Sequence, residues 1–240
     1  MKRVIMPVLA SLSFAAACGG DGGPTEVDTR PSVRFVNATT GMSSSGGFTT
    51  NGQFAAGSAL ASGQAMQTCS KLAVGTTSFG FGAANTGGTG LSGSALVTSN
   101  NETIVAGGSY TVVATGSAAN PSLFVFSNTL SSELGTNQAG LRFANFAPNT
   151  GTTVYNYVFY RGAITGGVSP LAINVPFGGI STFSIVPSGA TTFSVLQVPG
   201  HTVVMDGTSS ATLQGGSVNT MALVPTASGG FQLMHLPRCP

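Results

Sequence analysis

The sequence carries one pattern twice, with the two copies 108 positions apart. Arg34-Phe35-x-Asn37 recurs as Arg142-Phe143-x-Asn145, and Gly107-Gly108-Ser109 recurs as Gly215-Gly216-Ser217. The apolar runs LFVF at 123–126 and FQLM at 231–234 keep the same distance. Solenoids and propeller blades repeat every 20 to 50 residues or so, which is far shorter. The spacing therefore predicts two tandem domains, each about 100 residues long.

The landmarks set the expected boundaries of these domains. We expect a first domain at 32–128 and a second at 139–236, joined by residues 128–138. Inside the copies the register slips, since TTSF at 76–79 matches the segment around Phe193 at an offset near 114. Loops of unequal length explain that slip.

Strand patterns fill both copies, and helical patterns are almost absent. Only residues 53–67 could be helical, and their glycines and serines argue against it. Three dipeptides predict turns between neighbouring strands: Pro199-Gly200, Asp206-Gly207 and Gly215-Gly216. Many short strands per domain predict an all-β fold of two immunoglobulin-like β-sandwiches, with a closed barrel as the alternative. The clearest alternating or β-branched segments are residues 153–161, 190–198, 201–206 and 217–224.

The N-terminus is typical of an exported protein. Lys2 and Arg3 precede the uncharged residues 4–17, which are too few to span a bilayer and fit a signal peptide at 1–17. Ala15-Ala16-Ala17-Cys18 resembles the lipobox of bacterial lipoproteins, although Ala15 stands where leucine is usual. We expect lipidation of Cys18. Ordinary secretion by cleavage at the same bond is the alternative.

The number of cysteines favours the lipid anchor. Ordinary secretion would leave three cysteines, an awkward number in an oxidising compartment. Lipidation of Cys18 leaves Cys69 and Cys239, which we expect to form a disulfide. Residues 18–31 then form a flexible tether. In similar enterobacterial lipoproteins an aspartate after the lipidated cysteine favours inner-membrane retention; Gly19 at this position favours the outer membrane.

The charge composition excludes one class of partner. Without residues 1–17 the chain holds six basic and six acidic side chains and no basic cluster. Because nucleic-acid binding depends on lysine and arginine contacts to phosphates, no nucleic-acid partner is expected. Only 6% of the chain is charged, yet 42% is hydrophobic with 15 phenylalanines, which indicates a folded domain rather than disorder.

Motifs for catalysis are weak. Gly88-x-Gly90-x-x-Gly93 fits a dinucleotide pattern, but a strand-like segment follows it where a helix is required, so a loop is expected. Residues 207–211 approximate a nucleophile elbow without its closing glycine. The few titratable groups outside the tether show no catalytic or metal-ligand spacing, so we expect no enzyme activity, metal or cofactor. These groups include His201, His235, Glu102, Glu133 and Asp206.

One segment combines aromatic rings with polar tips. Tyr155, Tyr157, Tyr160 and Arg161 lie within nine residues of one another and form a candidate ligand face for a glycan or a peptide. The alternative is a strand with one core face and one ordinary surface face.

Several of these segments resemble one bacterial family. The opening VRFVNA at 33–38, the run NVPFGGISTFSIVPSGATTFSV at 174–195 and the late Gly-Gly-Ser are similar to the family called domain of unknown function 4397. The second copy, 141–236, carries the fuller resemblance. The first copy lacks V-P-F-G and has a Gly, Ser and Ala insertion at 42–66. The resemblance implies an immunoglobulin-like sandwich at the cell envelope, often in tandem copies, and transfers no catalytic residue.

Together these patterns predict a cell-envelope lipoprotein with two β-sandwich domains, held at a membrane by its lipid and acting as a surface binding or structural module. A glycan or an envelope protein is the expected partner. The alternative function is an envelope-polymer hydrolase whose residues converge from distant loops. A subunit of a larger envelope assembly is a third hypothesis.

Overall fold

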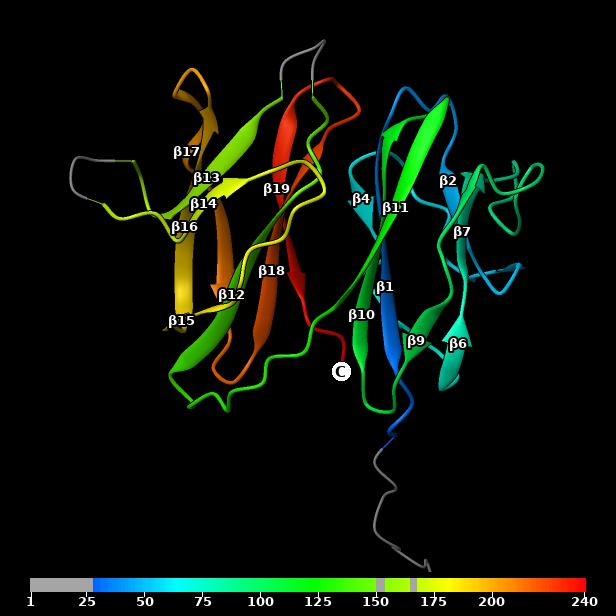
Figure 1. Cartoon of the computed structure of the whole chain (residues 1–240), viewed down its shortest axis with the longest axis horizontal. Coiled ribbons are helices and arrows are strands. Elements are labelled where there is room, and N and C mark those ends of the chain that lie inside the picture. The colour runs from blue at the N-terminus through cyan, green and yellow to red at the C-terminus, as the bar shows by residue number, and fades with distance from the viewer. Residues whose placement is uncertain (1–27, 150–153, 165–167) are drawn as a thin grey trace, which may run out of the picture.

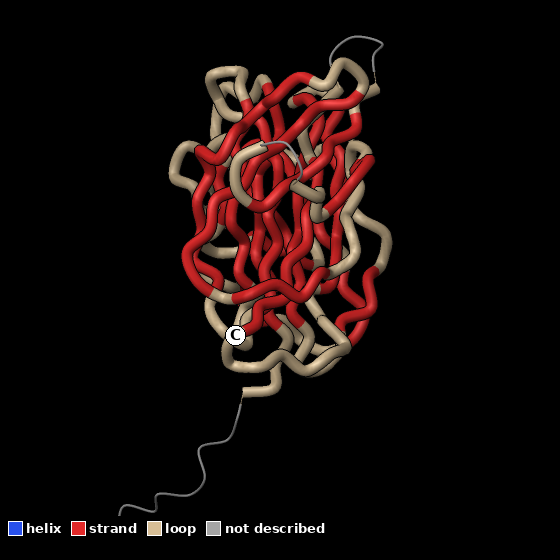
Figure 2. The backbone as a smooth tube through the Cα atoms, turned by 90° about the vertical axis from the view of Figure 1, so that its left-hand side faces the viewer, coloured by secondary structure: helices blue, strands red, loops and turns tan. Residues whose placement is uncertain are grey.

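The computed structural model describes residues 28–149, 154–164 and 168–240. All regular secondary structure in these residues is β-strand, and Figure 2 shows no helix in this part of the chain. The prediction of an all-β fold is confirmed. The main sheets are open and pack face to face, so the protein is built from β-sandwiches and not from a closed barrel.

The first half of the chain forms two main sheets and a short ribbon. The inner sheet has the order β11-β10-β1-β4, with β5 also paired to β1; the outer sheet has the order β3-β2-β7-β8. The ribbon pairs β6 with β9. Their bounds are β1 Ser32–Thr40, β2 Gly46–Thr50, β3 Gln53–Phe54, β4 Gln64–Ala65, β5 Ser70–Lys71, β6 Gly75–Thr77, β7 Phe79–Ala83, β8 Val97–Thr98, β9 Glu102–Ile104, β10 Ser109–Ser117 and β11 Asn120–Ser127.

The second half also forms two sheets. Its inner sheet has the order β15-β12-β18-β19, and its outer sheet has the order β14-β13-β16-β17. In both halves the first strand pairs in parallel with the strand after the Gly-Gly motif, β1 with β10 and β12 with β18. The bounds are β12 Gln138–Asn145, β13 Asn156–Arg161, β14 Ala172–Val175, β15 Ser184–Pro187, β16 Gly189–Val198, β17 Thr202–Leu213, β18 Val218–Pro225 and β19 Phe231–Pro237.

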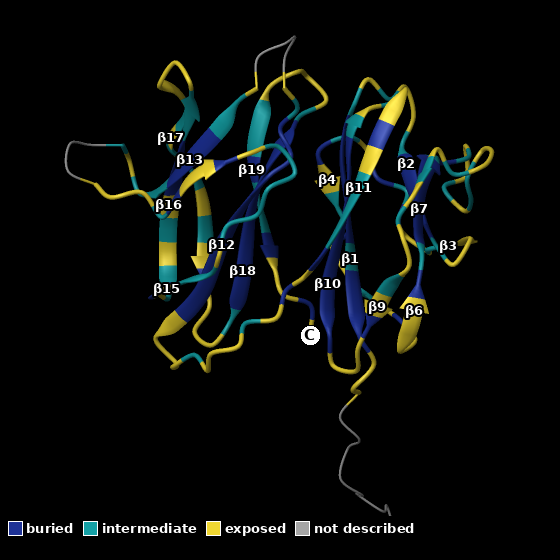
Figure 3. Cartoon of the chain, viewed as in Figure 1, coloured by how far each residue is buried: buried dark blue, intermediate teal, exposed yellow. Residues whose placement is uncertain are grey.

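The four main sheets stack as four layers (Figure 1). One apolar core lies between the two sheets of the first half and a second core between those of the second half. A third cluster joins the two inner sheets and includes Val36, Val113, Phe146 and Ala222. The inner strands β1, β10, β12 and β18 are therefore covered on both faces, as their dark blue colour in Figure 3 shows.

Alternation along β1 explains how one strand serves two cores. Val33 and Phe35 point into the core of the first half, whereas Val36 and Ala38 belong to the cluster between the inner sheets. Since side chains on a strand alternate between faces, a strand buried on both faces reads as a nearly continuous apolar run.

The cores of the two halves contain the same arrangement of three phenylalanine rings. Phe35 stacks on Phe48 with ring centroids 4.8 Å apart and meets Phe79 edge-on at 6.1 Å. In the second half, Phe143 stacks on Phe159 at 4.7 Å and meets Phe193 edge-on at 5.9 Å. Phe35 and Phe143 are the phenylalanines of the repeated sequence pattern.

The repeated asparagine also makes the same hydrogen bonds in both halves. The Asn37 amide nitrogen donates to Leu60 O at 2.8 Å, and its Oδ1 accepts from Thr39 N at 3.0 Å. The Asn145 amide likewise donates to Val175 O at 3.1 Å and accepts from Ala147 N at 3.0 Å. Each asparagine thus ties its inner strand to the segment that approaches from the opposite sheet. Buried amides need such partners, which explains why asparagine occurs at both positions.

The argument against a helix at 53–67 was right, and one predicted turn was wrong. Residues 53–67 contain strands β3 and β4 with turns and no helix. The Asp206-Gly207 pair lies inside β17, where Gly207 has a φ of +61° and the register with β16 shifts. The positive φ therefore makes a β-bulge there rather than a chain reversal, and Gly207 N donates to the buried Ser194 Oγ at 2.7 Å.

The chain enters and leaves the sandwiches at one end of the molecule. Figure 1 shows the start of β1 and the C-terminus at the lower end, with the β10–β11 and β18–β19 turns at the opposite end. A tether attached before β1 would therefore leave those turns facing away from its point of attachment.

Candidate functional site

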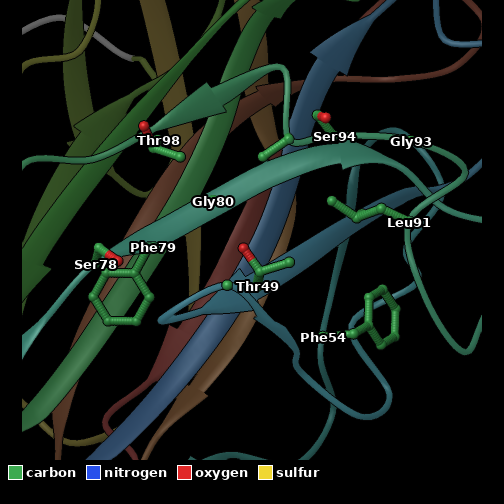
Figure 4. Close-up of a pocket in the computed structure, with 11 residues that line it drawn as sticks. Thr49, Phe54, Ser78, Phe79, Gly80, Leu91, Gly93, Ser94 and Thr98 are labelled. Carbon is green, nitrogen blue, oxygen red and sulfur yellow. The ribbon is translucent and has the colours of Figure 1, made fainter.

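A hollow on the outer sheet of the first half is one candidate site. It has a volume of about 330 Å³ and lies where strands β2 and β7 meet the segment before β8. Figure 4 shows Thr49 and Gly80 on the strands, Ser94 and Leu91 on the covering segment, and Phe54 beside them. We call this site the hydroxyl-lined hollow. Its defining side chains are Thr49, Phe54, Ser78, Leu91, Ser94 and Thr98.

Alternating glycines create the hollow. On β7, Phe79 and Phe81 point into the core, so Gly80 and Gly82 fall on the outer face. A Cβ on Gly82 would lie 3.3 Å from Leu91 Cδ1, and a Cβ on Gly80 would overlap Thr49 Oγ1. Glycine therefore lets the covering segment lie directly on the strand backbone.

The covering segment contains the sequence motif with three glycines. Asn85 Oδ1 accepts from Thr89 N at 3.0 Å, and Asn85 N donates to Gly90 O at 2.8 Å, which closes a turn. Gly88 in this turn has a φ of +64°. Strand β8 follows the motif, so the helix N-terminus that a dinucleotide site requires is missing from this described segment. The expectation of a loop was right.

The chemistry of the hollow is polar and uncharged. Thr49 is 6% exposed and forms part of the wall of the hollow. Ser94 and Thr98 add hydroxyls at the exposed rim, and Phe54 and Leu91 add apolar surface. No acidic or basic side chain lines this hollow. It can accept a neutral ligand that both donates and accepts hydrogen bonds.

A second hollow lies between the two halves. Its volume is about 430 Å³, and it is lined by Thr40 and Ser117 from the first half and by residues of the second half that include Asn149 and Phe231. It lies at the end where the β10–β11 and β18–β19 turns meet, opposite the C-terminus (Figure 1). Asn149 Oδ1 accepts a hydrogen bond from Tyr155 N at 3.0 Å.

The two halves are joined covalently. Cys69 and Cys239 form a disulfide across a sequence separation of 170, which confirms the pairing expected from the number of cysteines. Nearby, the Arg34 guanidinium donates to Met66 O at 3.4 Å and to Cys69 Sγ at 3.5 Å. Arg34 Nε is buried without a partner among the described residues, and burial lowers the Arg34 pKa.

Arg142, the repeat counterpart of Arg34, is held more fully. Its guanidinium donates to Thr220 Oγ1 at 3.0 Å and to both Ser127 O and Asn128 Oδ1 at 2.8 Å. It also lies over the rings of Phe126 and Phe183, at 4.7 Å and 4.4 Å from their centroids. Burial lowers the Arg142 pKa to about 10. The side chain thus joins the end of β11 to the inner sheet of the second half.

The four residues of the expected ligand face do not share one surface. Tyr157 is 1% exposed and lies in the core of the second half, where burial raises its pKa. Tyr155 packs against the same core. Arg161 donates to Thr191 Oγ1 at 2.8 Å and to Pro187 O at 3.2 Å, and only Tyr160 alternates to the outer face. Because an enclosed ring cannot contact a ligand, Tyr157 drops out of the candidate site.

The titratable groups are scattered over the described chain. His235 is half-buried and its Nε2 lies 2.8 Å from Asn219 Oδ1; burial and the charge of Arg34 lower its pKa. His201 is exposed in the turn between β16 and β17, and the Asp206 carboxylate accepts from Ile164 N at 2.9 Å. No three His, Cys, Asp or Glu side chains in the described residues are close enough to hold a metal ion. Cys18, the predicted lipidation site, lies outside the described residues.

Sequence reasoning missed the hydroxyl-lined hollow. Its residues come from four separate segments between Thr49 and Thr98, and serine, threonine and glycine are common throughout the chain. The one available signal was the alternation of Phe and Gly at 79–82, which places small residues on one face of a strand.

Comparison with known proteins gives one family. The model of the family described as domain of unknown function (DUF4397) matches residues 31–155, which cover the first half and the start of the second. This is the half that lacks the V-P-F-G turn. No curated protein matches the chain. Within the described residues, the structure contains no helix of the length and apolarity that a membrane span requires.

Proposed function

The chain belongs to the family described as domain of unknown function (DUF4397) and folds as β-sandwiches, and we propose a function from its own features. In this proposal the protein is a cell-envelope lipoprotein, anchored through Cys18, that acts as a binding or structural module rather than as an enzyme. We further propose that residues 32–128 and 139–236 are tandem copies of one domain.

The disulfide is the observation that carries the proposed location. Structural disulfides are typical of oxidising compartments and rare in the cytosol. The bond uses Cys69 and Cys239 and leaves Cys18, directly after the apolar N-terminal segment, as the third cysteine. With an acyl group on Cys18 and a disulfide between the other two, each of the three cysteines has a role.

The shape of the sandwiches supports display on a tether. The start of β1 and the C-terminus lie at one end, so an anchor before residue 28 would hold that end toward a membrane (Figure 1). The turns at the other end, and the hydroxyl-lined hollow on the outer sheet, would then remain open to partners. This arrangement suits a glycan or an envelope protein as ligand.

The proposal of tandem copies is supported by the repeated contacts. The phenylalanine trio and the asparagine bridge occur once in each half with nearly equal distances. Residues in the turns and loops differ, which explains why the register of the sequence repeat slips.

The alternative of a hydrolase acting on envelope polymers requires residues that converge from distant loops. His201 lies in the turn between β16 and β17, His235 lies on β19, and the Asp206 carboxylate accepts a hydrogen bond from a backbone amide. The arrangement of these groups favours a binding module over the hydrolase. Hydrolysis of isolated cell-wall polymers by the purified protein would reverse this preference.

Fractionation of cells that express the wild type and Cys18→Ala tests the location. We expect the wild type in the membrane fraction, with more in the outer than in the inner membrane. We expect no acylated, processed form of Cys18→Ala in the membrane fraction. Recovery of the processed wild type as a soluble protein would contradict the lipid anchor and favour ordinary secretion.

A further inference from the structure

Thr49 poses a question that the fold alone does not answer. A side-chain hydroxyl at the floor of an open hollow bonds to water until a ligand replaces that water. Thr49 is 6% exposed, yet its hydroxyl keeps contact with the hollow, since Arg34 Nε is the one fully buried side-chain atom without a partner in the described residues. Valine has the same shape and a high preference for strands, so packing alone does not call for threonine at this position.

The surroundings of Thr49 suggest what its hydroxyl meets. The side chain faces the hydroxyl-lined hollow, together with Ser94 and Thr98 (Figure 4). Phe54 and Leu91 supply flat and branched apolar surface beside these hydroxyls. The volume of about 330 Å³ is at the lower end of the range for small-molecule sites.

We propose that the hydroxyl-lined hollow binds one sugar unit of an uncharged polysaccharide. This inference deepens the proposed function and rests on it, because it gives the displayed module a class of ligand. Sugar hydroxyls both donate and accept hydrogen bonds, as the hydroxyls of Thr49, Ser94 and Thr98 do. The C–H face of a pyranose is apolar and can pack against Phe54 and Leu91.

The lining also decides against charged ligands. Carboxylate, phosphate and sulfate groups are recognised by arginine, lysine or backbone N–H groups with charge-assisted hydrogen bonds. No charged side chain lines this hollow, and its glycine-bearing floor is the middle of the paired strand β7. Backbone amides there are engaged in the sheet. An acidic sugar would lose its hydration without replacement.

The test uses the processed protein, purified in a zwitterionic detergent that has no sugar headgroup. An array of neutral and acidic polysaccharide fragments identifies the bound class, and calorimetric titration with the best neutral fragment gives the affinity. Thr49→Val removes the hydroxyl and keeps the shape of the side chain. Thr103→Val makes the same change at an exposed position on β9, outside the hollow, and serves as the matched control.

We expect binding of neutral fragments, about fivefold weaker in Thr49→Val as for the loss of one neutral hydrogen bond, and unchanged in Thr103→Val. The melting temperature of Thr49→Val should equal or exceed that of the wild type, because valine keeps the shape of the side chain and suits a strand. This result would separate a binding role from a structural one.

Three outcomes overturn the inference. The array could show no neutral fragment bound, or a preference for acidic fragments. Alternatively, Thr49→Val could bind as tightly as the wild type while Phe231→Ala, in the hollow between the halves, loses binding, which would move the site there. None of these outcomes bears on the anchor, which the fractionation of Cys18→Ala tests separately.

Discussion

Arg142 offers the sharpest test of how the two halves are held together. Replacement by methionine, Arg142→Met, keeps a long side chain but removes the guanidinium that bonds to Thr220, Ser127 and Asn128. Thr220 is 1% exposed and Asn128 is 4% exposed, so water cannot readily replace the bonds to these two residues, whereas Ser127 is exposed. The variant also loses the contacts of the charge with Phe126 and Phe183.

The expected magnitude follows from these contacts. A buried polar group that loses its partner costs about 1–3 kcal/mol, and two such groups, Thr220 and Asn128, are affected. Each contact of the charge with an aromatic ring adds about 0.5–1 kcal/mol or more. Against this, methionine avoids the desolvation of a buried charge, a cost that shows in the pKa of about 10. We therefore expect the free energy of unfolding to fall by about 3 kcal/mol, near the lower end of the gross loss.

Urea unfolding of the oxidised protein measures this change. Arg142→Lys should recover less than half of the loss, because an ammonium group cannot reproduce the planar fork or its stacking. Arg161→Met is the control, since Arg161 also makes two hydrogen bonds but lies at the partly exposed edge of the second half. A fall below about 1 kcal/mol for Arg142→Met, or a lysine variant equal to the wild type, would refute this reasoning.

The remaining predictions use the same unfolding assay. Cys69→Ser with Cys239→Ser should lower the free energy of unfolding by up to about 5 kcal/mol, since the bond closes a loop of sequence separation 170; an unchanged value under oxidising conditions would contradict its role. Stability should rise from pH 5 to pH 7.5, because burial lowers the pKa of His235 below its ordinary value of 6.5 and the folded protein resists its protonation; His235→Gln should reduce that rise, and an equal rise in the variant would exclude this cause. Gly46→Ala should cost about 1–3 kcal/mol, because its Cβ would overlap the Phe81 ring, and a neutral effect would show that the core adapts.

The repeat predicted the fold because its residues are those that the core needs. Phe35 and Asn37 are fixed by packing and by a bridge between the sheets, so their spacing survives while loops change length. The disulfide was predicted by counting cysteines rather than from geometry. The alternating pattern at 153–161 predicted a strand, and strand β13 occupies 156–161.

The failures have physical causes that a sequence does not display. A glycine with positive φ serves a turn or a bulge equally well, so Asp206-Gly207 could not be assigned from its residues. Tyr157 is a polar aromatic residue, but its alternation places it on the core side of β13. The hydroxyl-lined hollow depends on the covering segment that contains Leu91, and no local pattern shows where that segment folds.

Intact-mass and N-terminal peptide spectrometry of the protein extracted from membranes without reductant tests the central claim most directly. The account predicts a chain that begins at an acylated Cys18 and carries Cys69 and Cys239 as one disulfide. A processed chain with an unmodified N-terminus would contradict it. So would a chain that keeps residues 1–17 and has free thiols at Cys69 and Cys239.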